Sequence, residues 1–147
     1  MKKVISILLV LIISLSLVSC VAEKTNIEDC EWKMRAVMSS AVVADDSDTF
    51  VVAVGESDEI YPDAVVAEVL LNASDGILII TDITNNKIYT GTYKMTKSTP
   101  KSINYEIEIE GQQGCATVAQ TKYYTGEEIP TLPINLGEYS IYFIPNK

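Results

Sequence analysis

Histidine is absent from the sequence, which removes the commonest general base, the commonest metal ligand and the middle member of a Ser-His-Asp triad. The chain also has no Gly-x-Ser-x-Gly, phosphate-loop or Cys-x-x-Cys motif. We therefore expect that the protein is not an enzyme and that it holds neither a metal nor another cofactor.

Basic residues are scarce. Eleven lysine and arginine residues stand against 20 aspartate and glutamate residues, which gives a formal net charge of −9. Because a nucleic-acid-binding surface needs clustered Lys and Arg, nucleic acid is excluded as the main partner. The length of 147 residues is too short for a TIM barrel or a two-domain enzyme. It predicts one domain, which we expect to be a monomer.

Only one long apolar run occurs. It extends from Val4 to Val18, carries no charge and follows the positively charged start Met1-Lys2-Lys3. This length is typical of the apolar region of an export signal. It falls short of the roughly 20 apolar residues that a transmembrane helix needs.

The apolar run ends in Leu17-Val18-Ser19-Cys20, which resembles the lipobox of bacterial lipoproteins at all four positions. The resemblance implies cleavage after Ser19. It also implies a diacylglycerol on the sulfur of Cys20, with acyl chains such as palmitate that anchor the protein in a membrane. An ordinary signal peptide or an uncleaved anchor is the alternative.

The same resemblance implies an extracytoplasmic location in the cell envelope. In a Gram-positive host the anchor would lie in the outer face of the cytoplasmic membrane. In a Gram-negative host the outer membrane is expected, because Val21 is not the aspartate associated with retention in the inner membrane.

Three regions follow from this interpretation. Residues 1–19 form the signal peptide, residues 20–29 form the lipidated cysteine with a polar, flexible tether, and residues 30–147 form the domain. Loss of the signal peptide removes Lys2 and Lys3, so the net charge changes from −9 to −11.

The pattern of the domain is that of β-strands. In the clearest case four apolar positions, each separated by one polar residue, predict a strand with one buried and one wet face: Ile103, Tyr105, Ile107 and Ile109. Residues 49–54 predict a short buried strand, and residues 72–76 and 111–114 predict turns. Residues 64–71 fit a strand or two helical turns, and we favour the strand. Residues 127–137 predict a loop because they contain Pro130 and Pro133.

About eight strands joined in order by short turns predict an all-β domain with an antiparallel up-and-down meander. A meander of this length can curl into a small barrel, which buries its apolar face and removes exposed strand edges. A two-sheet β-sandwich is the alternative.

Three short stretches resemble the lipocalin-like, or calycin, small lipoproteins of bacteria. They are Glu31-Trp32-Lys33-Met34, the Gly91-Thr92-Tyr93 step and residues 137–143. Cys30 stands where that family has a glycine before the tryptophan. The resemblance implies a cup-shaped barrel that can hold a small apolar ligand.

Aromatic side chains on the strands are candidates to line such a ligand pocket, because pockets favour aromatic residues with a few polar tips. Alternatively, they are ordinary core residues or cross-strand pairs. The candidates are Trp32, Tyr89, Tyr93, Tyr105, Tyr123 and Tyr139.

Cys30 and Cys115 remain once Cys20 is lipidated, and an extracytoplasmic location permits a disulfide between them. Two unpaired thiols are the alternative.

The sequence therefore predicts a lipid-anchored, extracytoplasmic binding module, attached to the membrane through its N-terminal lipid, for a ligand that is small and apolar. The alternative is an envelope protein-interaction or structural lipoprotein that presents an acidic surface and performs no catalysis.

Overall fold

The structure is a computed structural model that describes residues 24–39, 50–57, 60–122 and 125–147. Cys20 and Tyr123 lie outside these residues. Within them the chain forms ten β-strands and no helix. The strands are β1 (Trp32–Ser39), β2 (Phe50–Val54), β3 (Val65–Val66), β4 (Val69–Ser74), β5 (Ile77–Asp82), β6 (Lys87–Ser98), β7 (Ser102–Ile109), β8 (Gln112–Lys122), β9 (Glu128–Leu136) and β10 (Tyr139–Pro145).

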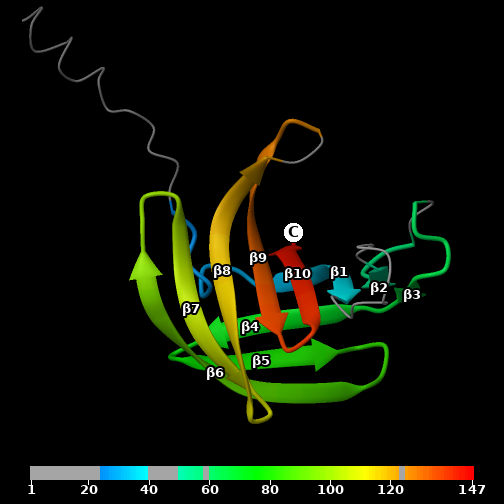
Figure 1. Cartoon of the computed structure of the whole chain (residues 1–147), viewed down its shortest axis with the longest axis horizontal. Coiled ribbons are helices and arrows are strands. Elements are labelled where there is room, and N and C mark those ends of the chain that lie inside the picture. The colour runs from blue at the N-terminus through cyan, green and yellow to red at the C-terminus, as the bar shows by residue number, and fades with distance from the viewer. Residues whose placement is uncertain (1–23, 40–49, 58–59, 123–124) are drawn as a thin grey trace, which may run out of the picture.

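Eight of the strands close into an antiparallel barrel. From β4 to β10 each strand pairs with the next one along the chain, and β1 pairs with both β4 and β10. The closing ladder runs from the pair Trp32–Pro145 to the pair Ser39–Tyr139. Figure 1 shows the strands wrapping around one interior. The all-β meander and its closure into a barrel are confirmed.

The two extra strands, β2 and β3, are inserted between β1 and β4. The first residues of β1 pair with β4, at Trp32 and Lys33, whereas its later residues pair with β2. The segment 64–71, for which we favour a strand over helical turns, contains β3 and the start of β4, separated by Ala67 and Glu68. β2 is less buried than expected, because the Val52 side chain is 39% exposed.

Two hairpin turns are shorter than the sequence indicated. Asp75 and Gly76 alone connect β4 to β5, and Glu110 and Gly111 alone connect β7 to β8. All four residues have positive φ angles, between 50° and 81°, as expected of two-residue type I′ turns. One ladder therefore continues to Ser74 and another begins at Gln112, two positions at which the sequence pattern predicts turn residues.

The loop expected over residues 127–137 is wrong, because residues 128–136 form β9. Both prolines are tolerated for a physical reason. Pro133 has no N–H, and the ladder between β8 and β9 lacks the pairs Thr117–Pro133 and Val118–Leu132. Pro130 lies beyond Leu132, the last residue of β9 that pairs with β10, so it faces an edge with no ladder to interrupt.

The barrel interior is filled by apolar side chains. The four alternating residues of β7 are all buried, and the core also includes buried side chains from β1, β4, β5, β8, β9 and β10. β6 contributes Tyr89 and Tyr93, which pack against this core.

Residues 24–31 cover one end of the barrel, which we call the closed end. Ile27 is fully buried there, and its carbonyl oxygen accepts a hydrogen bond of 2.8 Å from the indole Nε1 of Trp32. The hydroxyl of Tyr105 donates to the side-chain oxygen of Asn26 at 2.8 Å. Residues 24–29, expected to belong to a flexible tether, are therefore packed against the barrel.

Candidate functional site

The aromatic residues proposed for a pocket differ in their burial and contacts. Trp32 and Tyr105 are almost fully buried, and both hold the backbone of Ile27 at the closed end. The ring of Tyr93 meets the ring of Tyr105 edge to face, with 5.8 Å between centroids. Tyr89 is half-buried against the core, and Tyr139 is 43% exposed. None of these five side chains lines the clefts described below.

Burial also changes the pKa of one of these tyrosines. Burial raises the pKa of the Tyr105 hydroxyl above its ordinary value, despite a hydrogen bond from the backbone N–H of Ile27 that acts in the opposite direction. The Tyr93 hydroxyl donates to the carboxylate of Glu28. Trp32, Tyr93 and Tyr105 thus fix the N-terminal segment on the barrel.

The two described cysteines are both unpaired, and they occupy different surroundings. Cys30 is half-buried and packs against the core at the closed end. Cys115 is exposed on β8, where the amide nitrogen of Asn135 lies 3.8 Å from its sulfur. Burial, and secondarily the charge of Asp29, raises the pKa of the Cys30 thiol.

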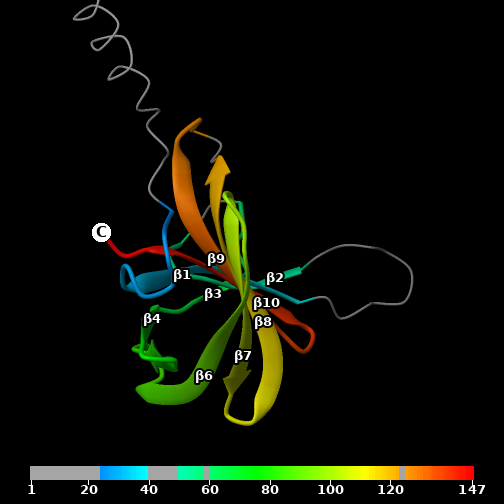
Figure 2. The same cartoon turned by 90° about the vertical axis from the view of Figure 1, so that its left-hand side faces the viewer.

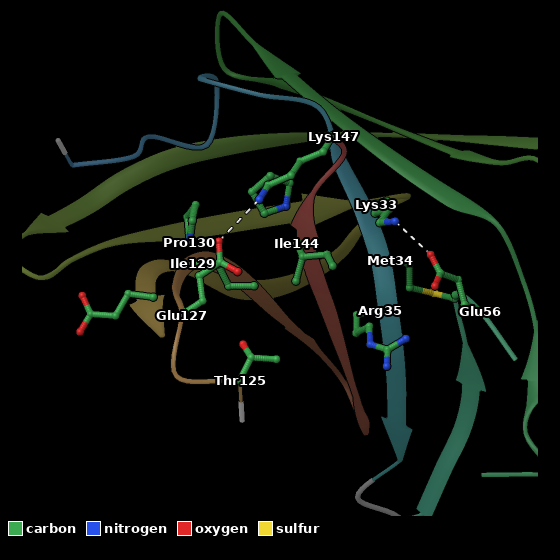
Figure 3. Close-up of a pocket in the computed structure, with 13 residues that line it drawn as sticks. Lys33, Met34, Arg35, Glu56, Thr125, Glu127, Ile129, Pro130, Ile144 and Lys147 are labelled. Atoms are coloured by element: carbon green, nitrogen blue, oxygen red, sulfur yellow. Dashed lines mark hydrogen bonds and ion pairs between the residues drawn. The ribbon is translucent and has the colours of Figure 1, made fainter. Parts of the chain in front are cut away.

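A cleft of about 470 Å³ opens in the barrel wall between β9 and β10 and extends over β1 (Figure 3). The ladder between β9 and β10 stops at the pair Leu132–Phe143. Two residues further along this register, Pro130 and Pro145 would fall opposite each other. Because neither has an N–H, neither can donate a hydrogen bond to the other strand. The paired prolines explain why the two strands separate here.

The floor of the cleft is apolar and its rim is charged. Met34, Ile129, Pro130, Ile144 and Pro145 supply the apolar lining. On the rim, Lys33 forms an ion pair with Glu56 at 3.0 Å, and Lys147 forms one with Glu127 at 3.8 Å (Figure 3). The hydrogen bond from Lys33 lowers the pKa of Glu56.

Arg35, the only arginine of the chain, reaches the cleft from a β-bulge. On β1, Met34 pairs with Phe143 and Ala36 pairs with Tyr142, so Arg35 is the extra residue between two consecutive pairs. A bulge redirects the side chains of a strand and is common beside binding sites. The bulge is therefore the local feature that sets the position of the guanidinium group.

Gly55, the residue directly after β2, supports the bulge. Its N–H donates to the carbonyl oxygen of Arg35 at 3.0 Å. A Cβ atom at this position would lie only 2.0 Å from the carbonyl oxygen of Met34. Only glycine allows the backbone after β2 to come this close to β1.

A second cleft of about 440 Å³ lies on the other side of the Lys33–Glu56 pair. Both residues, together with Met34 and Gly55, line both clefts. The second cleft continues over β3 and β4, where Val66, Val69 and Leu70 give it apolar walls. The ion pair thus stands between two neighbouring hollows.

The residues of the main cleft were absent from the set of candidates drawn from the sequence. Two signals could have pointed to them, the single arginine and the prolines at positions 130 and 145. Neither signal is interpretable without the register, because the prolines become opposite neighbours only once β9 and β10 are aligned.

In the described part of the chain, no group of three or more His, Cys, Asp or Glu side chains is arranged to hold a metal ion. Nor do those residues include a helix with the length and apolar character required to cross a membrane. Comparisons with protein families, with curated proteins and with solved structures gave no significant match.

Proposed function

We propose that this protein is a lipid-anchored, extracytoplasmic binding protein, without catalytic activity, whose cleft between β1, β9 and β10 takes a small amphipathic ligand with an anionic group. The observation that carries the proposal is the cleft itself. Its apolar floor and charged rim are held open by Pro130 and Pro145, and the only arginine is directed to it by a bulge.

The size and lining of the cleft support a small ligand. Its volume of about 470 Å³ lies in the range of sites for small molecules, which are mostly apolar with a few placed polar groups. The guanidinium of Arg35 can offer two parallel N–H donors to a carboxylate or phosphate. The apolar floor would then accept the rest of the ligand.

The filled barrel interior supports placing the ligand in this cleft. Trp32 and Tyr105, which the sequence suggested for a central pocket, are used to pack the closed end. A central ligand would have to displace such side chains, whereas the cleft already offers a hollow of about 470 Å³.

The envelope location is supported by the lipobox resemblance at residues 17–20. Two acyl chains on Cys20 would anchor the barrel durably, since each buried CH₂ contributes about 0.8 kcal/mol. The intact mass of the protein purified from its own host checks this step through the added mass on Cys20.

Native mass spectrometry of the unreduced, full mature protein tests the binding function. We expect an added mass that is lost on denaturation. The added mass should be lost or strongly reduced in Arg35→Met, which keeps the aliphatic part of the side chain but removes the guanidinium group. Lys87→Met is the matched control, because Lys87 is an exposed cation that does not line the cleft.

If wild-type protein from several growth conditions carries no added mass, the ligand function is overturned. That result would favour the alternative, a protein-interaction module with an acidic surface. Equal ligand loss in Arg35→Met and Lys87→Met would place the ligand elsewhere. Circular dichroism of both variants establishes that they are folded.

A further inference from the structure

Four lysines gather at the closed end of this acidic protein. Lys97 lies one residue before the end of β6, and Lys101 lies in the turn between β6 and β7. The ammonium group of Lys24 donates to the hydroxyl of Ser98 and to the carbonyl oxygen of Thr99 in the same turn. β8 continues past the start of β7 and ends at Lys122. We call Lys24, Lys97, Lys101 and Lys122 the lysine end.

The views in Figures 1 and 2 agree on this placement. The first described residues, the β6–β7 turn and the end of β8 lie at the same end of the barrel. The opposite end carries the turns after β5, β7 and β9, where Asp82, Glu110 and Glu138 are found. Four lysines thus lie at the lysine end, whereas Lys87 accompanies the acidic residues at the opposite end.

Acidic groups are not excluded from the lysine end. Glu28 accepts the hydrogen bond of Tyr93, Asp29 bonds the backbone N–H of Asn26, and Glu128 lies beside Lys24 and Lys101. Lys97, Lys101 and Lys122 are nevertheless exposed. They can meet a surface that approaches along the barrel axis.

The short stretch of chain between Cys20 and Lys24 indicates that this surface is the membrane. This step rests on the lipid anchor of the proposed function. Four residue steps separate Cys20 from Lys24, so their Cα atoms can be at most about 14 Å apart. Lys24 is bound to the β6–β7 turn. An acylated Cys20 therefore holds the lysine end close to the bilayer, at a distance comparable to the Debye length of about 8–10 Å.

A hollow of about 350 Å³ at this end suits a lipid headgroup. Lys24 and Lys101 line it together with Thr25, Gln120 and Glu128, and Pro100, Val118 and Ala119 form its apolar part. The two ammonium groups are suited to a phosphate, and the polar side chains can bond the remaining headgroup oxygens.

We propose that the lysine end is a docking surface for anionic phospholipid, with a headgroup phosphate held between Lys24 and Lys101. Docking in this direction turns the acidic opposite end away from the negative membrane surface. It also brings the ligand cleft near the bilayer, since Glu128 lines both the hollow and the cleft.

The test uses the full acylated protein reconstituted into two kinds of vesicle, phosphatidylcholine alone and phosphatidylcholine mixed with phosphatidylglycerol. A water-soluble amine-acylating reagent modifies the lysines, and peptide mass spectrometry gives the rate at each one. Lys87 is the internal control, because it is exposed on the same strand as Lys97 but near the other end. The variant pair Lys97→Gln/Lys101→Gln is compared with Lys87→Gln.

We expect the modification of Lys97 and Lys101 to slow several-fold on the mixed vesicles relative to the neutral ones, and high salt to reverse the effect. Lys87 should react at the same rate on both. In Lys97→Gln/Lys101→Gln, the protection of Lys122 should fall at least twofold, whereas Lys87→Gln should preserve it.

The docking surface alone would be overturned if Lys97 and Lys101, like Lys87, reacted as fast on the mixed vesicles as on the neutral ones while Cys20 carried its acyl chains. The anchor and the ligand cleft would then remain intact. A chain with no acyl group would overturn the anchor and this inference together. Ligand binding at Arg35 is read separately by native mass spectrometry, so the failures are distinguishable.

Discussion

Pro130 of β9 and Pro145 of β10 fall opposite each other when the register of the pair Leu132–Phe143 is continued by two residues, and the ladder between the strands stops before them. A pair of facing prolines has no donor on either side. The opening of the barrel wall is therefore caused by two prolines that are 15 positions apart in the chain.

Restoring the missing donors should close the cleft. In the double variant Pro130→Val/Pro145→Val, we expect β9 and β10 to continue their ladder, because valine favours strands and supplies the N–H groups. Hydrogen exchange should show new protection at positions 130 and 145, and the bound ligand mass should disappear. Pro133→Val is the matched control, since Pro133 interrupts the ladder to β8 and does not line the cleft. Unprotected amides at both substituted positions would contradict the explanation.

Gly55 should be required for the position of Arg35. Gly55→Ala places a methyl group in conflict with the carbonyl oxygen of Met34, so β1 and β2 must shift at the bulge. We expect a loss of about 1–3 kcal/mol in the free energy of unfolding, typical of overpacking, together with weaker ligand binding. Gly111→Ala is the control. It is strained by its φ of 81° but has open space around it, so it should lose stability and keep the ligand.

The β7 pattern and the barrel could be predicted because alternation and short turns are local signals. Asp75-Gly76 was recognisable because only a few residue types adopt its positive φ angles. β9 was missed because proline weighs against a strand unless one knows which edge its nitrogen faces. The cleft was missed because it depends on the register between β9 and β10, on the bulge at Arg35 and on the close contact of Gly55 with β1. None of these features produces a periodic pattern in the sequence.

The closed end was also beyond the sequence pattern. Ile27 is a single apolar residue in a polar stretch, and nothing in the spacing shows that it enters the barrel. Its burial depends on Trp32 and Tyr105, which are 5 and 78 positions away. Aromatic residues that suggested a ligand pocket turned out to hold a segment of the chain itself.

Removing the Ile27 side chain should therefore destabilise the whole barrel. Because Ile27 is fully buried, Ile27→Ala should lower the free energy of unfolding by about 2–5 kcal/mol. Trp32→Phe removes the donor to the buried Ile27 carbonyl and should cost about 1–3 kcal/mol for that bond alone, in addition to lost packing. Urea unfolding measures both. Ile60→Ala serves as the control, because Ile60 is 75% exposed, and an equal loss there would contradict the closed-end packing.

Glu31 should make the stability depend on pH. Hydrogen bonds from Asn72 at 3.0 Å and from Asn146 at 2.5 Å hold the pKa of this carboxyl below its ordinary value. A lowered pKa in the folded state stabilises the protein above the ordinary pKa, and this contribution is lost as the pH falls through the folded-state pKa. Glu31→Gln should therefore lower the Tm at neutral pH, and the difference should shrink in acid. A difference that stays constant from neutral to acidic pH would contradict this assignment.

The two cysteine thiols should differ in reactivity. Cys30 is half-buried and its pKa is raised, so the thiolate that reacts with iodoacetamide forms only at a higher pH than in a short unstructured peptide. Cys115 is exposed and should be alkylated first. Mass spectrometry of the unreduced protein over a pH series measures both rates, and urea-unfolded protein is the control in which the difference should vanish. Full resistance of both thiols, removed by reduction, would instead show that the purified protein carries a Cys30–Cys115 disulfide.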